Sequence, residues 1–127
     1  MTRSWALLAG GLWALLFTAG CKGECGDAAL RARYGTCVAT VTAGSCEAAG
    51  GMWLVVGLAG VSQCECPTGQ GECSCETRDE CLAGCIGGRD AKMPCVGTEL
   101  RCNATSNRLG CYCTADEEGL RAEICVD

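Results

Sequence analysis

Residues 64–85 read CECPTGQGECSCETRDECLAGC, and these 22 residues hold six of the 15 cysteines in a chain of 127. Two C-x-C pairs (residues 64–66 and 73–75) are followed by a C-x3-C pair (residues 81–85). The two cysteines of a C-x-C pair are poorly placed to bond each other, so they need partners elsewhere in the chain. The stretch therefore predicts a fold in which segments distant in sequence are joined by disulfides.

Little apolar surface is left outside this stretch to build a core. Leu, Ile, Val and Phe number 16 among residues 21–127, and chains below about 20% of these residues tend toward disorder unless something else holds them. Each disulfide removes denatured-state entropy worth roughly 2–4 kcal/mol. We therefore expect a small disulfide-rich α+β fold, in which short helices and β-hairpins are stapled by about seven disulfides.

The number of bridges follows from the cysteine count. All 15 cysteines lie at or after Cys21, and setting Cys21 aside leaves 14, enough for seven bridges. Sequence alone does not give their connectivity. The predicted disulfide cysteines are Cys25, Cys37, Cys46, Cys64, Cys66, Cys73, Cys75, Cys81, Cys85, Cys95, Cys102, Cys111, Cys113 and Cys125.

Residues 1–20 predict a secretory signal peptide. Arg3 precedes an uncharged run over residues 4–20, and this run ends in the small residues Thr18-Ala19-Gly20. An uncleaved membrane anchor is the alternative. It needs about 18–20 apolar residues, whereas this run has 17 uncharged residues, three of them Gly. We expect cleavage and export.

The residues around the expected cleavage point suggest a lipid anchor. Thr18-Ala19-Gly20-Cys21 resembles the lipobox of bacterial lipoproteins, with Thr where Leu is usual. The resemblance implies that Cys21 is diacylated on sulfur, and Lys22 after it implies the outer membrane of a Gram-negative cell. The expected partners are a membrane, held through this N-terminal lipid, and an unidentified extracellular or periplasmic protein. The alternative is an ordinary signal peptide and a secreted chain that begins with Cys.

Several functions are excluded or disfavoured by composition. The chain has no His, which excludes Ser-His and Cys-His relays and imidazole metal ligands. A net charge of −5 argues against nucleic-acid binding. Thiolate metal binding is the rival explanation of the C-x-C pairs, but the export signal and the lack of a C-x2-C pair argue against it. No cationic side chain is placed to lower a thiol pKa. We expect no enzymatic activity, no metal and no cofactor.

Cap and turn signals divide residues 21–74 into short elements. Asp27 and Thr42 are typical helix N-caps, and β-branched or apolar runs predict strands. The predicted elements are a helix over 28–33 ended by Gly35, a strand over 36–41, a helix over 43–49, a buried strand over 52–56 and its return over 61–66. We expect Trp53, in the most apolar of these runs, to lie in the core.

Residues 75–127 predict one longer helix and two strands. Thr77-Arg78-Asp79-Glu80 is a capping box, which predicts a helix over 78–85. Strands are expected over 98–103 and 110–114, a solvated helix start at 116–118, and a closing segment over 123–126. Asn103-Ala104-Thr105 is a glycosylation sequon, which matters only in a eukaryotic source.

The cysteine spacing in this half suggests a known motif. Cysteines four apart on a helix and two apart on a strand have similar spans, about 6 Å and about 6.6 Å. Residues 81–85 and 111–113 thereby resemble the cysteine-stabilised αβ motif of defensins and scorpion toxins. The resemblance implies the bridges Cys81–Cys111 and Cys85–Cys113, and the alternative is an unrelated pattern of bridges. Residues 64–69 and 111–113 also resemble the tails of EGF-like and trypsin-inhibitor-like modules.

The order Cys, Cys, C-x-C, Cys occurs twice, which places a boundary near residues 72–76. We assign residues 21–74 to an N-terminal and residues 75–127 to a C-terminal cysteine-rich subdomain. The function we expect is a binding or structural role at a bacterial cell envelope. The alternative is a soluble secreted inhibitor or toxin-like binding module.

Overall fold

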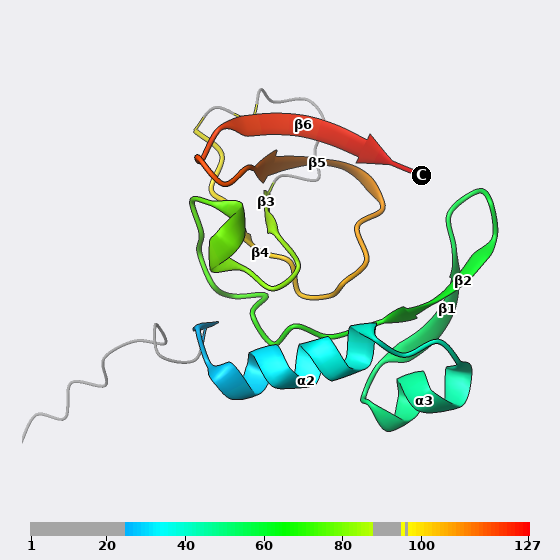
Figure 1. The fold of residues 1–127 in the computed structure, drawn as a ribbon. Helices are drawn as coiled ribbons and strands as arrows, with labels where there is room; N and C mark the ends of the chain where they lie inside the picture. The colour runs from blue at the N-terminus through cyan, green and yellow to red at the C-terminus, as the bar shows by residue number, and fades with distance from the viewer. Residues whose placement is uncertain (1–24, 88–94, 96) are drawn as a thin grey trace, which may run out of the picture.

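The computed structural model describes residues 25–87, 95 and 97–127 (Figure 1). Within them, two α-helices and a 3-10 helix accompany six strands in two antiparallel sheets. The elements are α2 (Ala28–Val38), α3 (Ala43–Ala48), β1 (Met52–Val56), β2 (Val61–Glu65), η1 (Arg78–Glu80), β3 (Cys85–Gly87), β4 (Arg101–Cys102), β5 (Gly110–Ala115) and β6 (Arg121–Val126). With its seven disulfides, this is the small disulfide-rich α+β fold that the sequence predicts.

The first helix, α2, is longer than the sequence analysis predicts. Asp27 caps it by accepting a hydrogen bond from the Ala29 N–H at 2.9 Å, as expected. The helix then continues through Gly35 to Val38, so the predicted stop at Gly35 and the predicted strand over 36–41 are wrong. The continuation places Leu30, Tyr34 and Cys37, spaced four and three residues apart, on one partly buried face. Burial of Cys37 overrides the weak helix propensity of the β-branched residues that surround it.

A short helix and a hairpin complete the first half. Thr42 and Ser45 form the cap of α3, which ends near the predicted residue. β1 and β2 then pair antiparallel, with Trp53 opposite Cys64 and Val56 opposite Val61. The predicted pair of strands is confirmed. In Figure 1 this hairpin projects from the end of the molecule that carries α3.

The second half is a four-stranded sheet in the order β4-β3-β5-β6. The predicted strand over 110–114 is confirmed as β5, and β6 begins two residues earlier than the closing segment expected from sequence. The strand expected over 98–103 shrinks to β4. The predicted helix over 78–85 is wrong: η1 ends at Glu80, Cys81 is extended, and Gly84 has φ +94°, a left-handed conformation that no helix continues.

Sulfur replaces aliphatic side chains in the core. Among the residues that the structure describes, eight of the twelve buried hydrophobic residues are cysteines, and Leu100 is the largest fully buried side chain. One buried cluster joins Leu100 and Ala115 to five cysteines of the second half. In the first half, the buried apolar residues are Cys37, Cys46 and Cys66 alone.

Backbone and amide hydrogen bonds join the two halves. Gln70 is almost fully buried, and its amide donates to the Cys25 carbonyl and accepts from the Leu82 N–H at 2.7 Å. The Thr68 hydroxyl, also buried, donates to the Asn103 carbonyl at 2.6 Å. These contacts hold the segment after the hairpin against the loop that leads into β5.

Candidate functional site

The structure pairs the fourteen predicted cysteines into seven bridges. Three lie within residues 25–73: Cys25–Cys73, Cys37–Cys66 and Cys46–Cys64. Four lie within residues 75–125: Cys75–Cys85, Cys81–Cys102, Cys95–Cys113 and Cys111–Cys125. Among the described cysteines, no bridge crosses residue 74, the boundary that the sequence predicts. Cys21 and the predicted signal peptide lie outside the described residues.

The bridges implied by the αβ motif are wrong. Cys81 bonds Cys102 and Cys85 bonds Cys75, because residues 81–85 do not form the helix that would place both cysteines on one face. On the strand side, Cys111 lies directly opposite Cys125 in the β5–β6 ladder and bonds it there. The two cysteines of residues 81–85 therefore bond different segments, Cys102 and Cys75. The two cysteines of residues 111–113 likewise bond Cys125 and Cys95.

Two bridges meet at the base of the hairpin. The Cys64 sulfur lies 3.6 Å from that of Cys37 and 3.5 Å from that of Cys66, so the Cys37–Cys66 and Cys46–Cys64 disulfides pack against each other. Gly51, at the start of β1, borders this sulfur cluster: a Cβ there would lie 2.5 Å from the Cys64 sulfur and 2.8 Å from that of Cys37. The absence of a side chain at Gly51 is what allows β1 to approach the bridges.

Two groups of cysteine sulfurs lie close enough together to suggest a metal site. They are Cys37, Cys64 and Cys66 at the hairpin base, and Cys75, Cys81 and Cys85 beside β3. Each of these sulfurs belongs to a disulfide. A disulfide sulfur carries no thiolate charge, and the thiolate is the form that ligates metals. In the oxidised protein the proximity of these sulfurs reflects neighbouring bridges.

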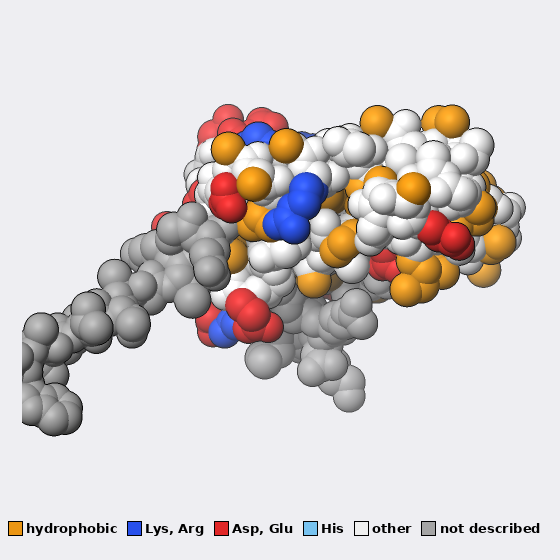
Figure 2. Space-filling model, turned by 90° about the horizontal axis from the view of Figure 1, so that it is seen from below, with side chains coloured by type: hydrophobic (Ala, Val, Ile, Leu, Met, Phe, Trp, Pro, Cys, Tyr) orange, Lys and Arg blue, Asp and Glu red, His pale blue; other side chains and the backbone are white. Residues whose placement is uncertain are grey.

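The hairpin carries several exposed apolar side chains. Val55, Leu58 and Val61 expose 70%, 91% and 57% of their surface. The expectation that residues 52–56 form a buried strand is therefore wrong, because a two-stranded sheet has too few neighbours to cover both faces. Figure 2 shows apolar side chains gathered over the end of the molecule that carries α3 and the hairpin. A disulfide-anchored projection with exposed apolar side chains can contact another molecule.

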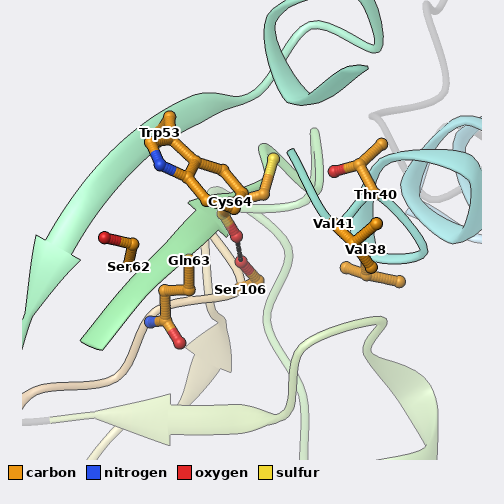
Figure 3. A pocket seen from close by; sticks show the side chains of 8 residues that line it. All are labelled: Val38, Thr40, Val41, Trp53, Ser62, Gln63, Cys64 and Ser106. Atoms are coloured by element: carbon orange, nitrogen blue, oxygen red, sulfur yellow. Dashed lines mark hydrogen bonds between the residues drawn. The ribbon is translucent and has the colours of Figure 1, made fainter. Parts of the chain in front are cut away.

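A shallow pocket of about 420 Å³ lies between this hairpin and the C-terminal end of α2. Figure 3 shows Trp53 and Cys64 on the hairpin side and Val38 and Val41 across from them, with the Ser106 hydroxyl donating to the Cys64 carbonyl at 3.4 Å. Trp53 is half-buried and lines this pocket, so the expectation that it belongs to the core is wrong. The pocket presents an indole face with apolar and hydroxyl-bearing neighbours.

A second pocket, of about 460 Å³, separates the hairpin from the four-stranded sheet. Val56 and Val61 line one wall and Tyr112 and Val126 the other, while Arg108 contributes a positive charge. The Arg108 guanidinium packs against Gly84, where a Cβ would lie 2.6 Å from Nη2. Burial raises the pKa of Tyr34, and the Arg108 charge partly opposes that shift.

Two other sequence features have local roles in the structure. Asn103 of the sequon is only 9% exposed, and its side-chain amide donates to the Asn107 carbonyl at 3.0 Å. Asp116 does not begin a helix as expected. Its carboxylate instead accepts from the Glu118 and Leu120 N–H groups and closes the turn between β5 and β6.

The comparisons with known proteins give this chain no relative. No family model, no curated protein and no solved structure matches it. Among the described residues, no helix is both long and apolar enough to span a bilayer. Seven disulfides fit an exported or extracellular protein, since reducing compartments keep thiols free.

Proposed function

We propose that this protein is a non-enzymatic binding protein of a bacterial cell envelope, anchored to the outer membrane by a lipid on Cys21. In this proposal it meets an extracellular or periplasmic protein through the β1–β2 hairpin. The observation that carries it is the exposure of Val55, Leu58 and Val61 on a hairpin whose base is fixed by two bridges. A preorganised projection loses little conformational entropy on binding.

The position of the anchor relative to the hairpin supports the proposal. Cys25 is disulfide-bonded to Cys73 and begins the described chain only four residues after Cys21, a covalent reach of about 14 Å at most. Figure 1 places the start of α2 and the hairpin at opposite ends of the molecule. A lipid on Cys21 would hold the first end at the membrane and leave the hairpin accessible to a partner.

Anchoring is tested by fractionation and mass. We expect the mature protein to sediment with membranes, to incorporate labelled fatty acid and to have an intact mass that includes the lipid, and Cys21→Ser to release it. A mature wild-type mass without lipid contradicts anchoring. Recovery of that unlipidated protein from the culture supernatant supports the alternative, a soluble secreted inhibitor. In that case the same disulfide-anchored hairpin would be the surface that contacts the target.

Binding through the hairpin is tested by photo-cross-linking in the cells that produce the protein. A photoreactive residue at Leu58 should yield one defined adduct, and the same residue at Ala32, exposed on α2, should not. Loss of the Leu58 adduct on Val55→Asp would extend the surface to the neighbouring strand residue. Equal adducts from both positions, or none from Leu58, contradict the proposal.

A further inference from the structure

β6 is an edge strand of the four-stranded sheet, and Asp127, which follows it, lies against Gly57 of the hairpin turn. β6 lies last in the order β4-β3-β5-β6 and pairs with β5 alone. All six residues from Arg121 to Val126 are exposed. Among the described residues, no backbone hydrogen bond outside the sheet ladder involves them. Exposed edges of this kind pair readily with another strand.

The β5–β6 register identifies which backbone groups are free. The Cα atoms of Cys111 and Cys125 lie 4.0 Å apart, the close spacing of a non-hydrogen-bonded pair in an antiparallel ladder. Hydrogen-bonded pairs alternate with such pairs, so Ala122, Ile124 and Val126 bond β5. Glu123 and Cys125 therefore direct their N–H and C=O groups outward, where a further strand would pair with them.

Several of the usual protections of an edge strand are missing from β6. The register with β5 runs without interruption from Arg121 to Val126, so the strand has no bulge. It contains no Pro and no Lys. Its side chains alternate between the two faces of the sheet. Ala122, Ile124 and Val126 form an apolar face, and Arg121 and Glu123 lie on the opposite face.

We propose that β6 pairs antiparallel with β6 of a second copy of this chain, with Ile124 opposite Ile124 at the two-fold axis. This register places Arg121 of each copy opposite Asp127 of the other. It also places Glu123 opposite Cys125, so the outward N–H and C=O groups of each copy meet those of the other. The two apolar faces, each Ala122, Ile124 and Val126, become continuous, and two four-stranded sheets become one of eight strands.

Charge selects this register over its neighbour. In an antiparallel pair of identical strands, the numbers of opposite residues add up to the same sum along the pair. Registers that keep both apolar faces on the same side differ in this sum by two at a time. Shifting toward the start of β6 places Glu123 opposite Glu123, two like charges that destabilise the pair. The Ile124-centred register replaces that repulsion with two Arg121–Asp127 attractions. The inference rests on β6 and on Asp127, which follows it, and does not depend on the proposed function.

The first test removes an outward donor. In the exported full chain carrying Cys21→Ser, sedimentation should show a concentration-dependent dimer, and Glu123→Pro should weaken it at least about tenfold, because Pro removes an N–H that only the second copy uses. Ala122→Pro is the matched control for the inward side. It should lower the melting temperature, because its N–H bonds β5, whereas Glu123→Pro should leave the melting temperature of the monomer nearly unchanged.

The second test uses charge. Arg121→Glu should weaken the dimer by about tenfold, because it turns two attractions into repulsions, and Asp127→Arg added to it should restore dimerisation. Restoration cannot come from the intramolecular hydrogen bond that Arg121 donates to the Thr98 carbonyl, since Asp127→Arg does not replace it. Glu118→Arg, a reversal in the turn before β6, should change nothing. Two results would overturn the proposal. One is a protein that stays monomeric at 100 times the concentration it reaches on export, and the other is a dimer whose affinity does not change with Glu123→Pro.

Discussion

Residues 25–73 and residues 75–127 are each closed by their own disulfides, but the two halves differ in the apolar residues that they bury. The second half gathers Leu100, Ala115 and five cysteines into one cluster beneath a four-stranded sheet. The first half buries three cysteines as its only apolar residues and leaves much of its hairpin exposed. The disulfides therefore have different roles in the two halves. In the second half they reinforce a small core, and in the first half they take the place of a core.

The difference predicts where each half is vulnerable. A half that has a packed cluster loses one contribution among several when one bridge is removed. A half without other buried apolar residues loses the contacts that position its elements. The covalent attachment of the first half's hairpin lies at its base, where Cys64 and Cys66 bond α3 and α2.

The largest effect is expected from removing the Cys46–Cys64 bridge. Replacing both cysteines by Ala removes a loop constraint of 18 residues and empties a site where Cys46 is fully buried. We expect a loss of about 4 kcal/mol in the free energy of unfolding. Removing the partly exposed Cys111–Cys125 bridge, which joins strands already paired in a ladder, should cost about 2 kcal/mol. Denaturant unfolding measures both, and equal losses would contradict the contrast between the halves.

A smaller loss should follow Gly51→Ala. The new Cβ would lie within 2.9 Å of the sulfurs of Cys64, Cys37 and Cys46, which their bridges hold in place. Overpacking of this kind costs about 2 kcal/mol. Gly44→Ala in α3 is the matched control, because nothing lies within 4 Å of its Cβ position and Ala favours a helix. Thermal unfolding should therefore move in opposite directions for the two variants.

The fold class and the helix caps could be predicted from the sequence, and the connectivity of the disulfides could not. The low aliphatic content and the fourteen cysteines that follow Cys21 indicate a fold of seven bridges, and Asp27, Thr42 and residues 110–114 indicate the correct element types. Which sulfurs meet depends on which strands become neighbours. Cys111 pairs with Cys125 only because β6 returns alongside β5, and no local pattern in residues 81–85 or 111–113 carries that information.

The candidate site was partly hidden for the same reason. Residues 52–56 form the most apolar run after residue 20, so the sequence predicts that they are buried. Among residues 25–87, 95 and 97–127, no third strand joins β1 and β2 to cover them, and this is a property of the whole fold. The Gly57-Leu58-Ala59-Gly60 turn was the available signal, because Leu at the tip of a tight turn has no neighbours to pack on.

The contact between the halves should respond to Gln70→Leu. This change leaves the Leu82 N–H without its acceptor and removes the amide that donates to the Cys25 carbonyl. An unsatisfied buried group costs about 1–3 kcal/mol, so we expect a loss of about 1.5 kcal/mol. Amide exchange should accelerate in both halves, since Gln70 joins them. Gln63→Leu, at an exposed position of β2, is the control and should leave exchange in the second half unchanged.

The smallest effect concerns pH and the capping box that begins η1. The N–H groups of Thr77 and Glu76 and the Thr77 hydroxyl donate to the Glu80 carboxylate and lower its pKa. A carboxyl whose folded pKa lies below its unfolded value stabilises the fold above the unfolded pKa and loses that contribution as pH falls through the folded one. Glu80→Gln should lower the melting temperature by about 2 °C or less at pH 7, because the site is exposed. The difference from wild type should shrink from about pH 4.3 downward. Asp79→Asn, the adjacent carboxylate outside the box, controls for net charge. A difference between Glu80→Gln and wild type that persists unchanged at pH 2 would show that the charge on Glu80 contributes nothing to the start of η1.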